Sequence, residues 1–496
     1  MNAMGPEPTD GRIGHPHDGI SAAAGSTGIE LLRRTQNRVH VAFLALVVLL
    51  AHSTDWCHAA TVMPLKLKEV VLAKAEPGAV PASVVVSSDF RRVAYVVIQR
   101  GKQHVFVDGK RAATLDGVGF GTPALSPDGK RLLFIGIRGI NSFVSVDGIE
   151  GKPFESIDRA EFSPDGKRVL FVAQRGGRFF VVINDVEGPA FDQIGEGDPQ
   201  FSEGGDHVAY AARRDGKWQL MVDDKPGPSF EAVGRGTRYF SADGKTLAYL
   251  AVRRGKYFVI VEGVEGKEYD AISDLIVADG GRVAYRAVSG KEQRVVLSGK
   301  EGPLCEAIIT GSLAFSKGGA RFGYVEKKGD LVNLVLDGVA GAGMRAVGPP
   351  VFGPANNRVA HKAERDLDTV VVLDDKEGPP FLGISADGPI FSPDGSRLVY
   401  SAQRGVSWVA VTDGVPGRAY DGIGLRSMAF SADSKHLAYW AKRGIRSVLV
   451  VDGSESPEYR SYVGTQPPKW DSTGTVSGLV LKDEEFVRIE AEAPQK

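Results

Sequence analysis

The sequence predicts an all-β fold built from about eleven copies of one unit of roughly 39 residues. Two observations support this prediction. A ten-residue motif recurs at nearly constant spacing, and each unit holds four short apolar segments separated by turn residues. The 62 glycines among 496 residues fit a chain with many tight turns. Four strands in a unit of this length are typical of a β-propeller blade.

The motif is clearest at Phe162, which opens FSPDGKRVLF. Other copies open at Leu125, Phe201, Phe240, Phe315, Phe391 and Phe430, and degenerate copies at Val86, Ile276, Phe352 and Trp470. Successive starts lie 36 to 40 residues apart, without linkers. Each small sheet has two apolar faces that only its neighbours can cover, so we expect the units to stack around an axis.

The copy at Phe162 predicts the strands of one blade. A first strand near residues 161–163 leads into a turn at 163–166, where Pro presets φ and Gly takes a positive φ. Residues 168–173 are almost all apolar, which predicts a strand buried on both faces. Residues 179–183 form the third predicted strand and residues 191–194 the fourth.

The last copy ends without a fourth strand, whereas residues 65–73 (LKLKEVVLA) form an orphan strand ahead of the first copy. We expect this N-terminal strand to complete the last blade and so to remove a free sheet edge. Eleven blades exceed the usual four to eight of a propeller. One large ring and two tandem rings therefore both remain open.

The motif FSPDGKRxAY resembles the WD40-like repeat of TolB-type periplasmic propellers, over about residues 65–492. The resemblance implies a β-propeller that acts as a binding scaffold in the cell envelope. TolB-type proteins also carry an N-terminal α/β domain, for which residues 1–64 are too short and too polar. A role in a Tol system is therefore in doubt.

The N-terminus has the layout of an exported protein. Three arginines precede an apolar run at residues 39–51, and small residues follow at Ala59 and Ala60. Basic, then apolar, then small is the order of a secretory signal peptide, and the run is shorter than a spanning helix needs. We expect residues 1–60 to be a disordered N-terminus with a signal peptide and residues 61–496 to be the propeller. The mature protein would be periplasmic or secreted without a membrane span; an uncleaved anchor is the alternative.

Charge predicts one candidate binding surface. The formal net charge of -1 gives no attraction to nucleic acid. The turns between the second and third strands are nevertheless basic in most copies, whereas many turns after the third strand are acidic. The basic turns predict a face for an acidic protein or an anionic envelope polymer, unless their charges only keep the hairpins soluble. The candidate binding residues are Arg100, Arg138, Arg175, Arg214, Arg254, Arg404 and Arg443.

No catalytic, metal-binding or cofactor-binding motif is present in the sequence. The recurring turn aspartates, such as Asp165, are too far apart to share a calcium ion and are expected to stabilise the turns. Cys305 is expected to be a small buried residue. The copy at Phe352 departs most from the repeat, because His361, Glu364, Arg365 and Asp366 replace the usual apolar stretch that leads to Arg-Gly, and we interpret the departure as drift.

These observations predict an exported, non-enzymatic β-propeller that binds a protein or ligand in the envelope. The alternative is a propeller enzyme, a hydrolase or lyase acting on a glycan or peptide in the central channel, because a site built from several blades leaves no linear motif. The partner and the oligomeric state are left open.

Overall fold

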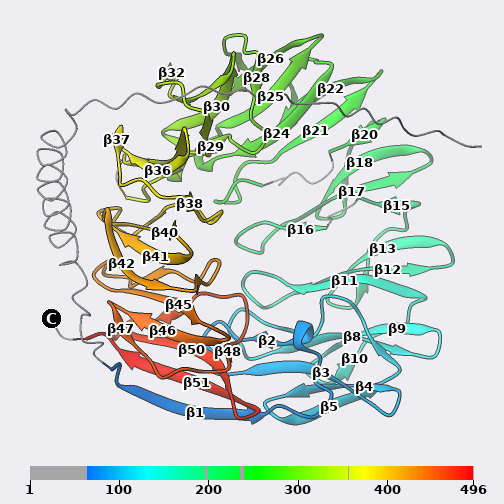
Figure 1. Ribbon diagram of the computed structural model, residues 1–496. Coiled ribbons are helices and arrows are strands. Elements are labelled where there is room, and N and C mark those ends of the chain that lie inside the picture. The colour runs from blue at the N-terminus through cyan, green and yellow to red at the C-terminus, as the bar shows by residue number, and fades with distance from the viewer. Residues whose placement is uncertain (1–63, 196–198, 235–239, 356, 495–496) are drawn as a thin grey trace, which may run out of the picture. The chain divides into compact units, whose positions relative to one another are not determined.

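The protein is an eleven-bladed β-propeller, in which four-stranded sheets follow one another around a single ring (Figure 1). The computed structural model describes residues 64–494, except 196–198, 235–239 and 356. The prediction of an all-β propeller with about eleven blades is confirmed, and of the two open arrangements the structure has one ring. We number the blades 1 to 11 along the chain and name their strands A to D from the inside outwards.

The A strands lie on the inner side of the ring, as β16 and β38 show in Figure 1. Most A strands are split in two by a bulge. In blade order the A strands are β2 (Val85–Val86), β6 (Gly117–Val118) with β7 (Ala124–Leu125), β11 (Ser156–Phe162), β15 (Gln193–Ile194) with β16 (Gln200–Phe201), β20 (Ala232–Val233), β24 (Ala271–Val277), β28 (Ala307–Ile308) with β29 (Ala314–Phe315), β33 (Ala346–Val347) with β34 (Val351–Phe352), β38 (Gly383–Ile384) with β39 (Ile390–Phe391), β43 (Gly422–Ile423) with β44 (Ala429–Phe430), and β48 (Ser461–Tyr462) with β49 (Lys469–Trp470).

The B and C strands form the central hairpin of each blade. The B strands are β3 (Val93–Gln99), β8 (Leu132–Arg138), β12 (Val169–Arg175), β17 (Val208–Arg214), β21 (Ala248–Arg253), β25 (Val283–Ser289), β30 (Phe322–Lys328), β35 (Val359–Arg365), β40 (Leu398–Arg404), β45 (Leu437–Arg443) and β50 (Thr475–Lys482). The C strands are β4 (Lys102–Val107), β9 (Asn141–Val146), β13 (Arg178–Ile183), β18 (Lys217–Val222), β22 (Lys256–Val261), β26 (Glu292–Leu297), β31 (Leu331–Leu336), β36 (Asp368–Leu373), β41 (Ser407–Thr412), β46 (Arg446–Val451) and β51 (Glu485–Glu492).

The D strands lie at the outer edge of each sheet, and most of them are only two residues long. They are β5 (Lys110–Leu115), β10 (Ile149–Glu150), β14 (Val186–Glu187), β19 (Lys225–Phe230), β23 (Val264–Glu265), β27 (Lys300–Glu301), β32 (Val339–Ala340), β37 (Lys376–Glu377), β42 (Val415–Tyr420), β47 (Ser454–Glu455) and, in blade 11, β1 (Leu67–Lys74).

The apolar run at residues 168–173 does form a buried B strand: the first five residues of β12 are all buried. The fourth strand differs from its prediction. Residues 191–194 are divided between two blades, because Phe191 bridges Phe179 in blade 3 while Gln193 and Ile194 pair with β17 of blade 4. The recurring aromatic-x-x-Ile pattern thus marks the passage from one blade to the next.

The N-terminal strand closes the ring, as the sequence predicted. β1 runs antiparallel to β51 as the outer strand of blade 11. At the closing interface, Ala73 of β1 and Leu479 of β50 pack against Val97 of β3 in one buried cluster. The rings of Tyr95 and Phe486 lie 5.2 Å apart across the same interface. Residues from both ends of the propeller therefore share one core.

Pairs of aromatic rings fasten many of the blades. A ring at the end of one blade's D segment meets a B-strand ring of the next blade edge-on, as Phe381 meets Tyr400 at 6.2 Å. Equivalent pairs are Phe154–Phe171, Phe191–Tyr210, Phe230–Tyr249, Tyr269–Tyr285 and Tyr420–Tyr439. Such pairs add about 0.5–1.5 kcal/mol beyond the apolar area they bury.

The described residues include three 3-10 turns, Pro81–Ser83, Asp279–Gly281 and Lys317–Gly319, and no helix among them has the length and apolar character to cross a bilayer. The predicted signal peptide, with its apolar core at residues 39–51, lies outside the described residues and remains a prediction.

Candidate functional site

The turn between the A and B strands shows why the motif recurs. In blade 3 the Ser163 hydroxyl donates to the Asp165 carboxylate at 2.6 Å, and the same carboxylate accepts from the Lys167 amide at 3.1 Å. These hydrogen bonds lower the pKa of Asp165 to about 2. Gly166 has a φ of 72°, which favours glycine. The turn aspartates are therefore part of a local turn network, as expected.

In the blades that have it, the motif arginine contacts the next blade. In blade 2, Arg131 donates from Nε to Asp147 at 3.0 Å and from Nη1 to the carbonyl oxygens of Gly166 and Lys167 in blade 3, both at 3.2 Å. Its guanidinium also lies over the Phe162 ring, 5.3 Å from the centroid. The same stacking recurs for Arg168, Arg282, Arg321, Arg358 and Arg397 over Phe201, Phe315, Phe352, Phe391 and Phe430.

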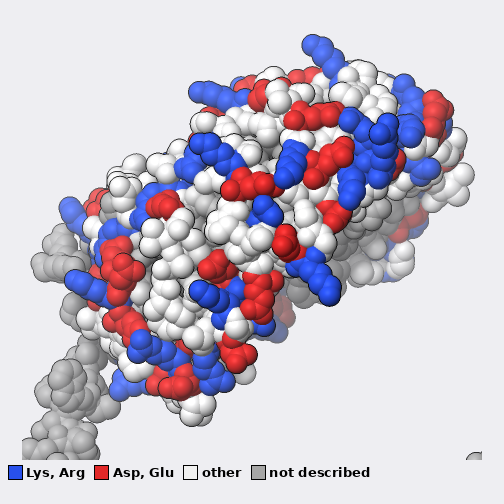
Figure 2. Space-filling view, turned by 90° about the horizontal axis from the view of Figure 1, so that it is seen from above, with Lys and Arg blue, Asp and Glu red and all other residues white. Residues whose placement is uncertain are grey.

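This linkage accounts for many acidic residues in the turns between the C and D strands. Asp108, Asp147, Asp337, Asp374 and Asp413 each accept from the motif arginine of their own blade. Where histidine replaces that arginine, His207 and His436 bond to Asp223 and Asp452. The positive and negative charges of this face are thus largely paired. Figure 2, which views the molecule from above Figure 1, shows basic and acidic side chains interspersed on that side as well.

The seven predicted binding arginines all lie at or beside the turns between the B and C strands, but their surroundings differ. Arg138, Arg175 and Arg443 form ion pairs with a glutamate of their own blade: Glu150 at 2.6 Å, Glu187 at 3.1 Å and Glu455 at 2.7 Å. Arg214 donates to the Ala190 carbonyl oxygen at 2.9 Å. The side chains of Arg100, Arg254 and Arg404 form no ion pair with any described residue. These three are therefore the ones free to meet an anionic partner.

Exposed aliphatic side chains lie at the tips of the same turns in three consecutive blades. Leu367, Val406 and Ile445, in blades 8, 9 and 10, are 88%, 94% and 94% exposed. The equivalent turn positions in blades 3, 4 and 5 are glycines (Gly177, Gly216 and Gly255). Nothing in a two-residue turn requires an aliphatic residue at this position. We call these three residues the aliphatic tips.

A hollow of about 350 Å³ lies beside the aliphatic tips, between blades 8 and 9. Pro380, Leu382, Pro416 and the predicted binding residue Arg404 line it. The sequence analysis found Arg404 but missed the aliphatic tips. The sequence did contain a signal for them. Each is the second residue of a turn between the B and C strands, where most other blades have glycine or a polar residue.

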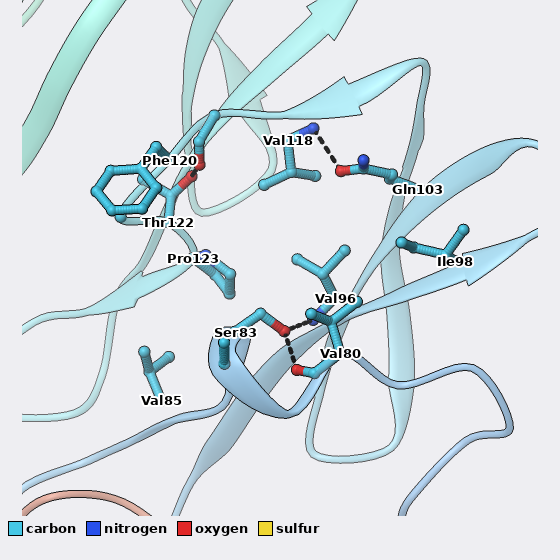
Figure 3. Close-up of a pocket in the computed structure, with 13 residues that line it drawn as sticks. Val80, Ser83, Val85, Val96, Ile98, Gln103, Val118, Phe120, Thr122 and Pro123 are labelled. Atoms are coloured by element: carbon cyan, nitrogen blue, oxygen red, sulfur yellow. Dashed lines mark hydrogen bonds between the residues drawn. The ribbon is translucent and has the colours of Figure 1, made fainter. Parts of the chain in front are cut away.

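A second hollow, of about 420 Å³, lies between blades 1 and 2 (Figure 3). Its walls are apolar, and Phe120 at its edge is 97% exposed. Its polar groups are already bonded: Ser83 Oγ donates to the Val80 carbonyl oxygen at 2.7 Å and accepts from the Val96 amide at 2.8 Å. The hollow can therefore accept an apolar group but offers few free polar contacts.

Acidic residues in the bulges of the inner strands bridge neighbouring blades. Asp387 of blade 9 accepts from the Arg426 amide of blade 10 at 2.6 Å, and Asp274 of blade 6 accepts from the Gly311 amide of blade 7 at 3.1 Å. Asp274 also lies 3.3 Å from the Arg286 guanidinium. These carboxylates thus serve to hold blades together.

Cys305 is partly buried and donates from Sγ to Glu326 at 3.1 Å. Burial and the Glu326 carboxylate raise the pKa of this thiol to about 12, so it stays protonated and unreactive at neutral pH. The described residues hold no group of three or more His, Cys, Asp or Glu side chains arranged for a metal ion.

No protein-family model and no curated protein matches the chain. Among solved structures it is similar to an eukaryotic initiation factor, at 10% identity and a TM-score of 0.38 over 72% of this chain and 96% of the other. It is also similar to the Dos1 propeller, at 9% identity and a TM-score of 0.29 over 68% of this chain and 92% of the other. A third is the β-propeller domain of the Trilobed protease from Pyrococcus furiosus, at 13% identity and a TM-score of 0.25 over 61% of this chain and 97% of the other.

Proposed function

We propose that the protein is an exported, non-enzymatic scaffold of the cell envelope that docks an acidic protein partner on its B–C turns, centred on blades 9 and 10. The main support for this proposal is that two of the aliphatic tips lie next to arginines that form no ion pair. Arg404 and Arg446 flank Val406 and Ile445, and neither arginine pairs with a described carboxylate. Exposed apolar groups with unpaired arginines are the composition of protein interfaces.

The hollow between blades 8 and 9 supports the same surface. It lies next to Arg404 and Gly405, so a side chain of the partner could enter it while an acidic residue meets the guanidinium. The envelope location is supported by the basic and apolar N-terminal segment and by the resemblance of the repeat to that of TolB-type propellers.

The docking surface is tested by capture from an envelope extract on immobilised protein, at low and high salt. We expect Arg404→Glu and a Val406→Asp, Ile445→Asp double variant each to reduce capture of the salt-sensitive partner at least tenfold. Ile140→Asp is the matched control, because Ile140 occupies the same position in the turn of blade 2 and is 90% exposed. Equal capture by all variants would overturn the proposed surface.

Export is tested separately by N-terminal sequencing of the protein from cell fractions. A mature N-terminus just after Ala59 or Ala60, in the envelope fraction, is the expected result. A full-length chain in the cytoplasm would contradict export without bearing on the docking surface.

A further inference from the structure

Between blades 7 and 8 the propeller contains a cavity of about 790 Å³, large enough for a small organic ligand. Leu334, Leu336 and Met344 of blade 7 and Val372 of blade 8 form apolar walls. His361 of β35 also lines it. The buried cluster at this interface has three members, Ala363, Val370 and Val372, whereas the clusters between the other described blades have six to eleven.

The cavity coincides with a missing pair of aromatic rings. By strand register, Met344 takes the place of Phe381 and His361 takes the place of Tyr400, which form a ring pair between blades 8 and 9. Between blades 8 and 9 that ring pair is buried, with Phe381 and Tyr400 7% and 2% exposed.

Two carboxylates at this cavity occupy positions that accept hydrogen bonds from phenols in other blades. In blade 4 the Tyr210 hydroxyl donates to Asp224 at 2.6 Å. Asp375 holds the place of Asp224 in blade 8, and His361 the place of Tyr210. No described residue donates a hydrogen bond to the Asp375 carboxylate.

The second carboxylate is Glu377. Its equivalents accept from the tyrosine that ends the preceding blade: Tyr269 donates to Glu301, Tyr420 to Glu455 and Tyr459 to Glu69, at 2.7–2.8 Å. Met344 replaces that tyrosine ahead of Glu377, whose described partner is Arg365 at 2.8 Å. The interface between blades 7 and 8 therefore has no tyrosine at either of these two positions, while the carboxylates at both acceptor positions are present.

We propose that the cavity between blades 7 and 8 binds a hydroxylated aromatic compound, whose ring replaces the missing pair and whose phenol donates to Asp375 or Glu377. The apolar walls suit the ring, and the carboxylates require a neutral phenol as donor rather than an anion. Burial lowers the pKa of His361 to about 4, so the imidazole is also neutral at physiological pH. This site does not depend on the docking surface of the turns.

The test is titration of the purified full chain with p-cresol, the side chain of tyrosine as a free molecule, by ligand-observed NMR and calorimetry. We expect one site with a dissociation constant on the order of 1 mM. Toluene, which lacks the hydroxyl, should bind at least tenfold more weakly. Benzylammonium binding without p-cresol binding would show a cation site and would overturn the proposal, as would equal affinity for toluene and p-cresol.

Variants locate the site. Met344→Phe combined with His361→Tyr fills the cavity and should abolish binding; His361→Tyr alone serves if the double variant does not fold. Asp375→Gly combined with Glu377→Ala removes the acceptors and should weaken binding at least fivefold; glycine is chosen because the φ of Asp375 is 63°. Asp185→Gly, at the same turn position in blade 3 with a φ of 64°, is the matched control. Unchanged p-cresol binding in the filled variant would refute the site.

Discussion

Exchanging the side chains of two blade interfaces tests whether aromatic pairs set their strength. Met344→Phe with His361→Tyr gives the interface between blades 7 and 8 the ring pair found between blades 8 and 9. The reverse exchange, Phe381→Met with Tyr400→His, removes that pair. Phe381 and Tyr400 are 7% and 2% exposed, so the reverse exchange acts on a filled core.

The magnitudes follow from the contacts. An added ring pair contributes about 1 kcal/mol, and burial of the additional apolar surface about 1 kcal/mol more. The first exchange should therefore stabilise its interface by about 2 kcal/mol. The reverse exchange loses the same contacts and places an imidazole in an apolar cluster, which costs about 1–3 kcal/mol more. We expect it to destabilise its interface by about 3–5 kcal/mol.

Amide hydrogen exchange is a more sensitive measure of these changes in interface stability than the melting temperature. A propeller of about 430 residues has an unfolding entropy of about 0.9 kcal/mol/K, so 2 kcal/mol moves the melting temperature by only about 2 °C. The same 2 kcal/mol slows local opening about 30-fold. Amides of β35 and β36 should therefore exchange about 30-fold more slowly in the first variant, while those of β12 stay unchanged. Equal exchange rates in the parent protein and in both variants would refute this account of the interfaces.

Four further outcomes are expected. Deleting residues 64–74 removes β1 and with it the bonds of Glu69 to Lys482 and Tyr459, so denaturant unfolding should show a loss of several kcal/mol; unchanged stability would contradict ring closure by this strand. Arg397→Lys loses the stacking on Phe430 and should cost about 1–2 kcal/mol, whereas Arg404→Lys, with no ion pair to lose, should cost little. Asp165 has a folded pKa of about 2, below its unfolded value, so its contribution is complete above about pH 4 and lost as pH falls towards 2; Ser163→Ala should raise that pKa in an NMR titration. His361 has a folded pKa of about 4, below the unfolded value near 6.5, so the unfolded chain binds more protons between these pH values and stability should rise over this range by up to about 3 kcal/mol; His361→Tyr should remove that rise.

The repeat was enough to predict the blade, because its signals are local. The turn at Ser163, Asp165 and Gly166 and the apolar strand after it act within a dozen residues, where spacing and residue type decide the structure. The orphan segment at residues 65–73 could be assigned to the last blade by counting strands. The division of residues 191–194 between two blades could not be predicted, since it depends on which sheet each residue joins.

Contacts between blades were beyond the sequence pattern. Arg131 contacts Gly166 and the Phe162 ring of the next blade. A single copy of the motif does not show which residues of the next blade lie within reach of its arginine. The charges of the turns also did not reveal the ion-pair partners of the turn arginines. Arg138, for example, pairs with Glu150, which lies on the D strand of the same blade and not in a turn. The choice of one ring depends on the angle between neighbouring blades, which no single residue sets. The predicted role of the basic turns stays a prediction.

Because the ring is closed, the size of the core at each blade interface decides where local opening begins. A ring has no terminal blade, so opening one interface leaves the other ten intact, and the cost is the free energy of that interface alone. Openings should therefore begin where the shared core is smallest, at Ala363, Val370 and Val372 between blades 7 and 8. The interface between blades 11 and 1 should not open first, because β1 contributes to its large core, which includes Ala73, Tyr95 and Phe486. Local opening is thus directed away from the chain termini and towards the cavity that can admit a ligand.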